Sequence, residues 1–121
     1  MKKLLFTFFF MLFAFTFYAQ VGYEFFQMTT VESVVPGGLG RSRLIMTDEK
    51  GAILEAKMEN FFSMVGINFE NIRANDKMIG DKISELASKG WELQHVYGGA
   101  YGHQESTGIF ITRYIFRRPK N

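Results

Sequence analysis

The most constraining feature of this sequence is a change of hydrophobic period at Gly90. From Asp76 to Ser88 the apolar side chains recur at the spacing of an amphipathic helix, which predicts one main helix. From residue 91 to residue 97 apolar and polar side chains alternate, which predicts a strand with one buried face. Gly90 stands where the left-handed residue after a helix is expected. The chain therefore combines a helix with a sheet, and we expect the helix to begin at a cap on Asn75 or Asp76.

Four further segments have the composition of strands, so that an α+β domain is expected. They are residues 21–35, 42–47, 52–60 and 109–118. Residues 48–51 (DEKG) predict the turn between the second and third strands, with Gly51 at positive φ. Residues 70–75 predict a polar connection and residues 98–108 a glycine-rich loop. The expected fold is a small antiparallel sheet in the order β-β-β-α-β-β, with the helix packed on one face.

Apolar residues of the helix and of the last two strands form the predicted core. Trp91 is expected to pack under the helix rather than to serve as a platform for a ligand. His95 shares the predicted face of Trp91, which favours a buried histidine bonded to a neighbour. The core residues that we expect are Ile79, Ile83, Leu86, Trp91, Leu93 and Phe116.

Residues 1–19 have the order of a secretory signal peptide: Lys2 and Lys3, an apolar run over residues 4–18, and Ala19 before polar Gln20. The run is fifteen residues long, and roughly 17 to 25 residues are needed to span a bilayer. We therefore expect export to the periplasm or the cell exterior and a single domain over residues 20–121. An uncleaved membrane anchor is the alternative, because Phe17 occupies a position near the cut that favours a small side chain.

Composition excludes two classes of protein. The chain has no cysteine, so a disulfide-stapled fold is excluded and the mature chain must be held by its core. Once Lys2 and Lys3 are set aside, twelve basic residues face twelve acidic ones. That balance argues against a basic nucleic-acid binder that works by neutralising phosphates.

The helix, its glycine and the strand after it resemble a known family. Residues 83–93 (ISELASKGWEL) and residues 114–119 (YIFRRP) resemble the small bacterial family called domain of unknown function 4177. The resemblance covers residues 76–120, and the aromatic segment at residues 23–26 is similar to the family's first strand. Residues 36–75 exceed the compact family pattern and look like the longer exported variants of Bacteroidetes-type bacteria. The resemblance implies the fold and an exported habitat, and it implies no catalytic residue.

A glycine-rich segment with two arginines is a candidate anion-binding loop. Successive backbone amides beside guanidinium groups can hold a phosphate, sulfate or carboxylate. The segment lacks the Lys-Ser/Thr pair of a nucleotide loop and precedes a strand, so a plain hairpin connection is the alternative. The residues concerned are Gly37, Gly38, Gly40, Arg41 and Arg43.

Residues 61–69 (FFSMVGINF) form the densest apolar cluster outside the first nineteen residues and the strands. This cluster is expected to cover the second face of the sheet, because a sheet with a single helix needs a second cover. If part of it is exposed, it marks a surface for a partner or an apolar ligand. The residues that would form such a surface are Phe61, Phe62, Met64 and Phe69.

His95, His103 and Glu105 are weak candidates for metal ligands, because their spacing matches no established motif. The sequence has no Gly-x-Ser-x-Gly elbow, no cysteine nucleophile and no distinctive carboxylate pair. We therefore expect no resident metal, no cofactor and no catalytic residue.

The sequence favours an exported, non-catalytic binding or assembly module with a protein or envelope partner. A metal-dependent or hydrolytic envelope enzyme is one alternative. A self-assembling structural protein is the other. Its copies would pair through the edge of the strand at residues 109–116 or bury the cluster at residues 61–69. Contact with the membrane is expected only through an uncleaved signal segment.

Overall fold

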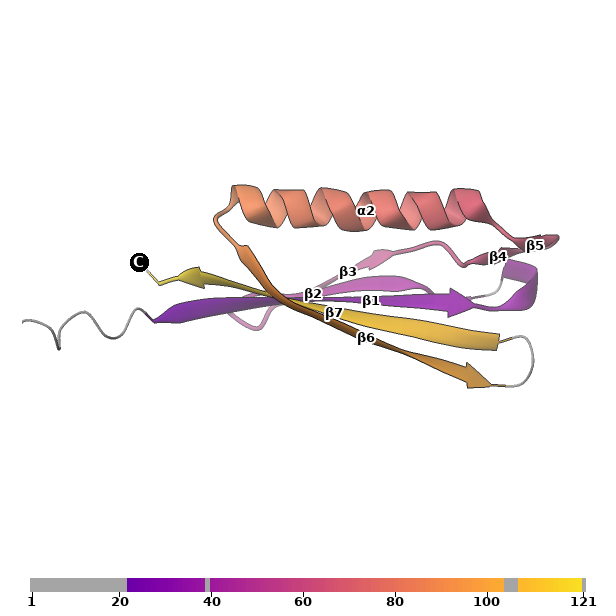
Figure 1. The fold of residues 1–121 in the computed structure, drawn as a ribbon, viewed down its shortest axis with the longest axis horizontal. Coiled ribbons are helices and arrows are strands. Elements are labelled where there is room, and N and C mark those ends of the chain that lie inside the picture. The colour runs from indigo at the N-terminus through magenta and orange to yellow at the C-terminus, as the bar shows by residue number, and fades with distance from the viewer. Residues whose placement is uncertain (1–21, 39, 104–106, 121) are drawn as a thin grey trace, which may run out of the picture.

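The computed structural model describes residues 22–38, 40–103 and 107–120. In these residues five strands form one antiparallel sheet, and a single long helix lies across one of its faces (Figure 1). The elements in chain order are β1 (Tyr23–Val34), a 3-10 turn (Pro36–Gly38), β2 (Arg43–Thr47), β3 (Ile53–Lys57), β4 (Phe62–Ser63), β5 (Gly66–Ile67), α2 (Phe69–Ser88), β6 (Glu92–His103) and β7 (Thr107–Pro119). The predicted α+β class is confirmed. The predicted order β-β-β-α-β-β is wrong, because β4 and β5 form a separate hairpin before the helix and the sheet is larger than expected.

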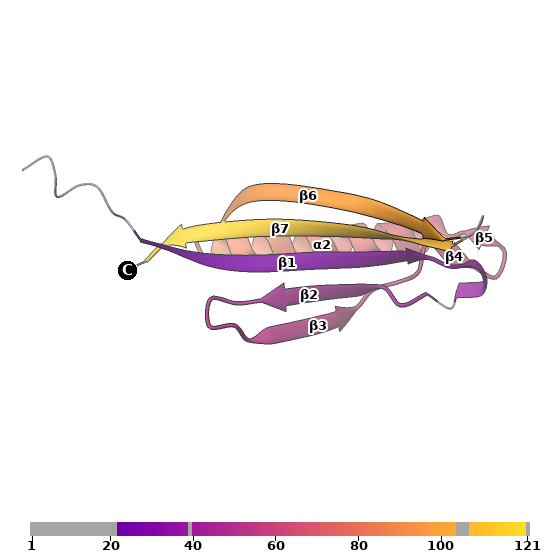
Figure 2. The ribbon, with the colours of Figure 1, turned by 90° about the horizontal axis from the view of Figure 1, so that it is seen from below.

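The first and last strands lie side by side in the middle of the sheet, whose order is β3-β2-β1-β7-β6 (Figure 2). β1 and β7 are paired along their whole length, from Tyr23 opposite Pro119 to Val34 opposite Gly108. The edges of the sheet are β3 and β6. Because β7 is paired on both sides, the expected edge-to-edge pairing of residues 109–116 with a second copy has no free edge to use.

The helix begins seven residues earlier than predicted, at Phe69 instead of Asp76. Its cap is Asn68, whose side-chain oxygen accepts hydrogen bonds from the amides of Glu70 and Asn71 at 3.0 and 3.2 Å. Four of the six residues at 70–75 are polar, which is why the sequence analysis predicted a polar connection there. The predicted end is confirmed, since the helix stops at Ser88 and Gly90 has a φ of 83°.

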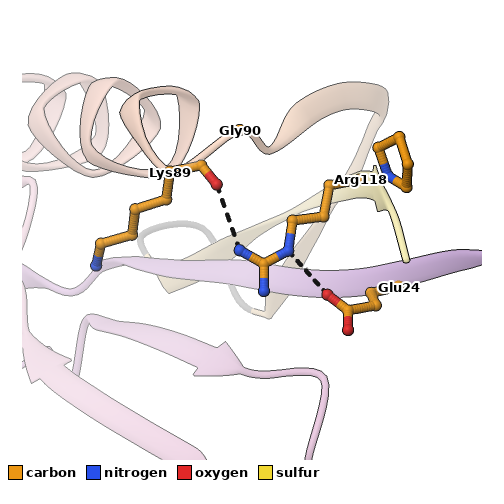
Figure 3. Close-up of a pocket in the computed structure, with 5 residues that line it drawn as sticks. Glu24, Lys89, Gly90 and Arg118 are labelled. Carbon is orange, nitrogen blue, oxygen red and sulfur yellow. Dashed lines mark hydrogen bonds and ion pairs between the residues drawn. The ribbon is translucent and has the colours of Figure 1, made fainter. Parts of the chain in front are cut away.

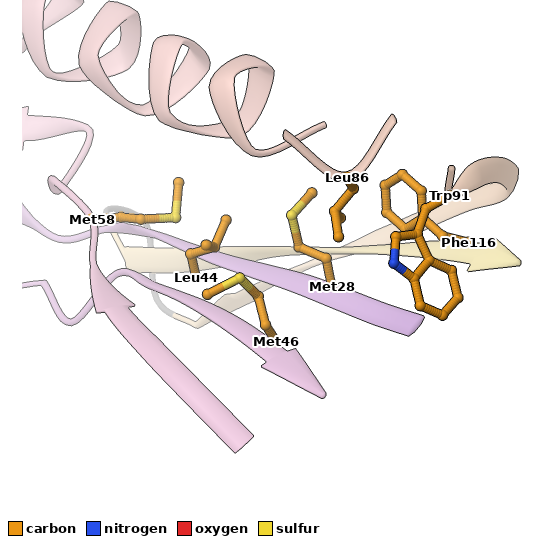
Figure 4. Close-up of a cluster of buried hydrophobic side chains, with 7 residues drawn as sticks. All are labelled: Met28, Leu44, Met46, Met58, Leu86, Trp91 and Phe116. Atoms are coloured by element: carbon orange, nitrogen blue, oxygen red, sulfur yellow. The ribbon is translucent and has the colours of Figure 1, made fainter. Parts of the chain in front are cut away.

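The core lies between the helix and the sheet (Figure 4). Its buried apolar members are Met28, Leu44, Met46, Met58, Leu86, Trp91 and Phe116. The prediction is confirmed for Leu86, Trp91 and Phe116, while Ile79 and Ile83 are partly buried against the same cluster. Phe26 contacts Trp91 with ring centroids 5.6 Å apart, which ties β1 to the residue that follows the helix.

The predicted faces of β6 are wrong beyond its first residues. A bulge between Leu93 and His95 shifts the pairing, so that Leu93 lies opposite Phe116 and His95 lies opposite Ile115. His95 therefore lies on the face of the sheet away from the helix, and it is exposed. Leu93 is 43% exposed and is not a core residue. It belongs to β6, an edge strand that has a neighbouring strand on only one side within the described sheet.

Residues 98–108 were expected to form a loop, and this prediction is wrong as well. β6 continues to His103 and β7 begins at Thr107. Two of the glycines in this segment allow close backbone contact: a Cβ on Gly98 would lie 3.0 Å from the carbonyl oxygen of Ile111, and one on Gly108 equally close to that of Tyr101. These glycines therefore fit a tightly paired hairpin.

Candidate functional site

In the part of the chain that the structure describes, the side of the sheet away from the helix has no cover, and we call it the open face. Side chains alternate along a strand, so in β1 the neighbours of the core residue Met28 point away from the helix. The strand register places the odd-numbered residues of β1, β2, β3 and β7 together on this face. After its bulge, β6 adds His95, Tyr97 and Tyr101. In Figure 1 the helix lies on the opposite side, and no described element lies across the open face.

About half of the side chains on the open face are apolar, although a solvated side of an antiparallel sheet is usually polar. Five of its residues are clearly exposed, among them Phe25 at 57%, Ile53 at 64% and Tyr101 at 64%. Its partly buried members occupy the central strands. The apolar residues of the face are Tyr23, Phe25, Val31, Ile45, Ile53, Tyr97, Tyr101, Ile109, Ile111 and Ile115. Polar and charged side chains such as Gln27, Arg43 and Lys57 lie between these residues, so the apolar residues form several exposed patches on one face. Exposed apolar patches are typical of contact surfaces.

Three charged side chains on the open face lack partners among the described residues, namely Arg113, Glu55 and Lys57, and the first two are opposite in sign. Arg113 lies in β7 between Ile111 and Ile115 and is partly buried. Glu55 lies in β3 at the same level of the sheet, because the register runs from Glu55 through Ile45 and Thr29 to Arg113. Neither side chain makes a hydrogen bond or an ion pair with any residue that the structure describes. Both remain available to a molecule that covers the face.

The other arginine of β7 on this face is already engaged. The guanidinium of Arg117 lies 4.5 Å from the centre of the Tyr23 ring, which is a cation–π contact. Its Nε is 3.9 Å from a carboxylate oxygen of Glu92. Arg117 therefore holds the end of the sheet together, and Arg113 is the arginine of β7 that stays free.

The apolar cluster at residues 61–69 is split by the fold and does not cover the open face. Phe61 packs on Phe110 with ring centroids 5.8 Å apart, and Phe62 is also partly buried. Met64 and Phe69 are 86% and 65% exposed. Val65, at the end of the β4–β5 hairpin, is 96% exposed. The expectation of a second cover is therefore wrong, and the exposed part forms an apolar hairpin tip beside the start of the helix.

Three asparagines that the sequence analysis did not single out fix the first half of the helix. Asn75 is buried, and its side chain accepts from the amide of Glu59 at 2.8 Å and donates to the carbonyl of the same residue at 2.9 Å. Asn71 donates to the carbonyl of Asn60 at 2.8 Å. The Asn60 side chain in turn accepts a hydrogen bond from the amide of Val35 and donates one to the carbonyl of Val35, the residue after β1. The high asparagine content of residues 60–75 was the available signal, whereas the sequence analysis predicted a polar connection only at residues 70–75.

The candidate anion loop is only partly assembled. Gly37 adopts a φ of 78° and lines a polar cavity of about 240 Å³ together with Gly40, Lys57 and Asn60. Gly38 lies in the same 3-10 turn as Gly37. A Cβ on Gly40 would lie 2.0 Å from the side-chain oxygen of Asn60, so this glycine permits close packing.

The two arginines of that loop lie elsewhere. Arg41 is exposed, and Arg43 belongs to β2 on the open face, where its Nη1 donates to the carbonyl of Ser42 at 2.9 Å. Neither arginine lines the cavity. The glycines and the guanidinium groups therefore do not converge on one point.

A second polar cavity, of about 380 Å³, lies at the end of the helix (Figure 3). Arg118 dominates it and is fully engaged. Its Nε donates to Glu24 at 2.8 Å, its Nη1 donates to the carbonyl of Lys89 at 3.3 Å, and its guanidinium stacks 4.4 Å over the Trp91 ring. Glu49 lies 3.7 Å from its Nη2. These contacts use the charge of Arg118 to join the helix end to β1, so little of that charge is left for a ligand.

The candidate metal ligands are separated by the extended strand. His95 and His103 both lie in β6, eight residues apart, at an expected distance of about 26 Å along the strand. Glu105 lies outside the described residues, as does the side chain of His103. Among the side chains that the structure describes, no three His, Asp or Glu residues gather closely enough to hold a metal ion.

Among the residues that the structure describes, three titratable groups have shifted pKa values. Burial raises the pKa of Glu32, against a hydrogen bond from Asn75 that lowers it, and the charge of Asp76 adds to the rise. Burial also raises the pKa of Tyr114, and the charge of Glu32 contributes. Hydrogen bonds from Lys82 and Lys89 lower the pKa of Glu85 to about 2. The Glu32 and Tyr114 shifts follow mainly from burial on the helix side of the sheet.

Within the described part of the chain, no helix has both the length and the apolar character needed to cross a membrane. The chain was compared with protein-family models, with curated proteins and with solved structures, and none of the three comparisons found a match.

Proposed function

We propose that this protein is an exported, non-catalytic binding or assembly module that acts in the cell envelope or outside the cell. The observation that carries the proposal is the open face. Exposed aromatic and aliphatic side chains that gather on one face cost free energy in water and are typical of a contact surface between proteins. The tyrosine, phenylalanine and arginine side chains on the face are residue types that are enriched in interface centres.

The exported habitat rests on residues 1–19, whose basic start, apolar run and small residue are those of a signal peptide. The resemblance to domain of unknown function 4177 supports the same habitat. The two polar cavities are weaker candidates for a binding site, which supports binding through the open face. In one cavity the charge of Arg118 is already paired. The other cavity lies apart from both arginines of its loop.

Site-specific photo-crosslinking in the producing cells tests the proposal. A benzophenone amino acid replaces Tyr97, an exposed aromatic residue of the open face, and in a control variant it replaces Lys77, which is exposed on the helix. We expect adducts from position 97 and none from position 77. The mass of the processed protein, measured in the same sample, should be that of a chain that begins at Gln20.

Equal labelling at both positions, or none at either, would contradict a contact role for the face. Turnover of a substrate by the purified protein would contradict the non-catalytic part. A mass that retains residues 1–19 would contradict cleavage and favour a membrane anchor.

A further inference from the structure

We propose that the outer edge of β6 pairs with the same edge of a second copy of this chain, antiparallel and about a two-fold axis at Gly99. The pairing joins the two five-stranded sheets into one continuous sheet. This inference goes beyond the proposed function, because it concerns an edge of the sheet and that function concerns a face. Three observations carry it: the edge is unpaired, it lacks the usual protection, and its sequence is nearly palindromic.

The outer edge of β6 is unpaired. β6 lies at the border of the described sheet, with β7 on its other side (Figure 2). In an antiparallel sheet, every other residue of an edge strand directs its amide and carbonyl outward. No hydrogen bond joins the outward groups of β6 to any residue that the structure describes. Past the bulge, residues 96–102 pair regularly with β7, so they offer a regular template for another strand.

This edge also lacks the protection that edge strands usually have, such as charge, proline or short length. β3, the other edge of the sheet, is five residues long and carries Glu55 and Lys57. β6 is twelve residues long, and residues 93–102 include no Asp, Glu, Lys, Arg or Pro. Its aromatic side chains Tyr97 and Tyr101 are 53% and 64% exposed. A long, uncharged edge of this kind is protected when another strand covers it.

The sequence of the edge identifies the other strand. Residues 95–103 (HVYGGAYGH) read almost the same in both directions around Gly99. When a strand pairs antiparallel with its own copy, each residue before the axis lies opposite the residue at the same distance after it. With the axis at Gly99, Tyr97 of each copy lies opposite the partner's Tyr101. Like residues therefore meet, which favours a second copy of the chain over an unrelated strand.

The side chains fit this register. After the bulge, the odd-numbered residues of β6 lie on the open face, so both tyrosine pairs form there. Aromatic pairs on neighbouring strands stabilise a sheet. The helix side of the same edge carries the small residues Gly98, Ala100 and Gly102, which leave room for the second copy.

The pairing supplies enough contact for a reversible dimer. Over residues 96–102 an antiparallel ladder forms about one hydrogen bond per residue, or about seven in all. A typical protein interface contains roughly 10, with a spread of about 5. The tyrosine pairs add apolar contact. Because the interface is small, monomer and dimer should exchange with concentration.

A single charge at the axis tests the dimer. The full-length gene is expressed, and the protein is purified with whatever N-terminus the cells leave on it. Sedimentation equilibrium from micromolar to near-millimolar concentration should show a monomer–dimer equilibrium. Gly99→Lys should weaken the dimer about tenfold or more, because two like charges then lie opposite each other. The fold should tolerate the change, since a Cβ on Gly99 would meet no atom within 4 Å.

Gly80→Lys is the matched control. Gly80 is exposed on the helix, and a Cβ there also would meet no atom within 4 Å. The same change of charge should therefore leave the dimer intact. Gly99→Ala adds a side chain without a charge and should keep most of the affinity. Circular dichroism checks that each variant is folded.

A disulfide tests the register, and it decides the question if Gly99→Lys does not fold. The chain has no cysteine, so an introduced thiol can form a protein disulfide only with its copy. In Gly99→Cys the two thiols lie opposite each other at the axis, within the roughly 7 Å between Cα atoms that a disulfide needs. Mild oxidation should give a covalent dimer. In His95→Cys the two thiols lie about 27 Å apart along the strands and should stay reduced.

Several outcomes would overturn the inference. A monomer mass at every concentration would do so, and so would a dimer that Gly99→Lys does not weaken. Equal oxidation of Gly99→Cys and His95→Cys would refute the register.

The edge pairing and the binding function can fail separately. If the protein is a monomer and position 97 still crosslinks to a different protein in cells, the edge pairing is refuted while the binding function stands. A benzophenone amino acid at Phe25, which lies on the open face two strands from the edge, tests the face by itself. A dimer that Gly99→Lys weakens, without adducts from position 25, would support the edge pairing and count against the face.

Discussion

The two faces of the sheet carry similar side chains in opposite surroundings. On the helix side Met28, Leu44 and Phe116 are at most 1% exposed. On the open face Phe25 and Ile53 are more than half exposed. Both sets come from one sheet and differ in which side of the strand alternation they occupy. The difference shows that the alternation of a strand decides which residues share a face, whereas the helix decides which face is buried.

Matched phenylalanine substitutions measure that difference most directly. Phe116→Ala removes a buried ring and should lower the free energy of unfolding by about 3–5 kcal/mol. Phe25→Ala removes a ring that is 57% exposed and should cost under about 1 kcal/mol in dilute protein. Urea unfolding at one low protein concentration gives both values. Equal losses would mean that the two faces are equally buried, against the structure.

The next largest loss of stability is expected at Asn75, whose side chain binds the helix to the backbone of Glu59. Asn75→Ala leaves the amide and the carbonyl of Glu59 without their partner, and the expected loss is about 2–4 kcal/mol. Asn71→Ala removes one hydrogen bond at a less buried site and should cost about 1 kcal/mol. The same urea experiment measures both. A loss at Asn75 no larger than the loss at Asn71 would show that this contact does not secure the helix.

The smallest effect is a pH dependence on the helix side. The pKa of Glu32 is raised above its ordinary value of 4.5, so the folded protein holds this proton more tightly than the unfolded chain does. Its contribution is therefore fully present below pH 4.5 and is lost as pH rises through the raised value. Glu32→Gln should flatten this fall, since glutamine still accepts the hydrogen bond from Asn75.

Glu85→Gln is the matched control for Glu32→Gln. The pKa of Glu85 is lowered to about 2, so its contribution is present above pH 4.5 and is lost between that value and about pH 2. This substitution should leave the slope above pH 4.5 unchanged. Unfolding measured from pH 4 to pH 8 separates the two variants. An unchanged slope in Glu32→Gln would assign the pH dependence to another group.

Local signals in the sequence predicted much of the fold. The turn glycine Gly51, the helix end at Gly90 and the burial of Trp91 all follow from the chain within a few residues, and all are confirmed. The three strands before the helix were placed within three residues of their ends. Features of this kind depend on nearest neighbours, so one sequence is enough to show them.

The errors arise where distant segments meet. The first turns of the helix depend on Asn75 binding Glu59, a contact that no helical period reveals. The bulge before His95 changes the face of every later residue of β6. The open face escaped notice for a similar reason. β7 is apolar on both of its sides, which was the available signal, and the cluster at residues 61–69 was assigned to the second side.

The pairing of β1 with β7 determines when this protein can fold. β1 is among the first segments of the described chain to be synthesised, and its partner Thr107–Pro119 is the last. Until that strand is made, β1, β2 and β3 form half a sheet whose inner edge is unpaired. Contacts between such distant segments slow folding and postpone it to the end of synthesis. A chain with this topology cannot complete its sheet while it is being made, which is compatible with the export that we propose.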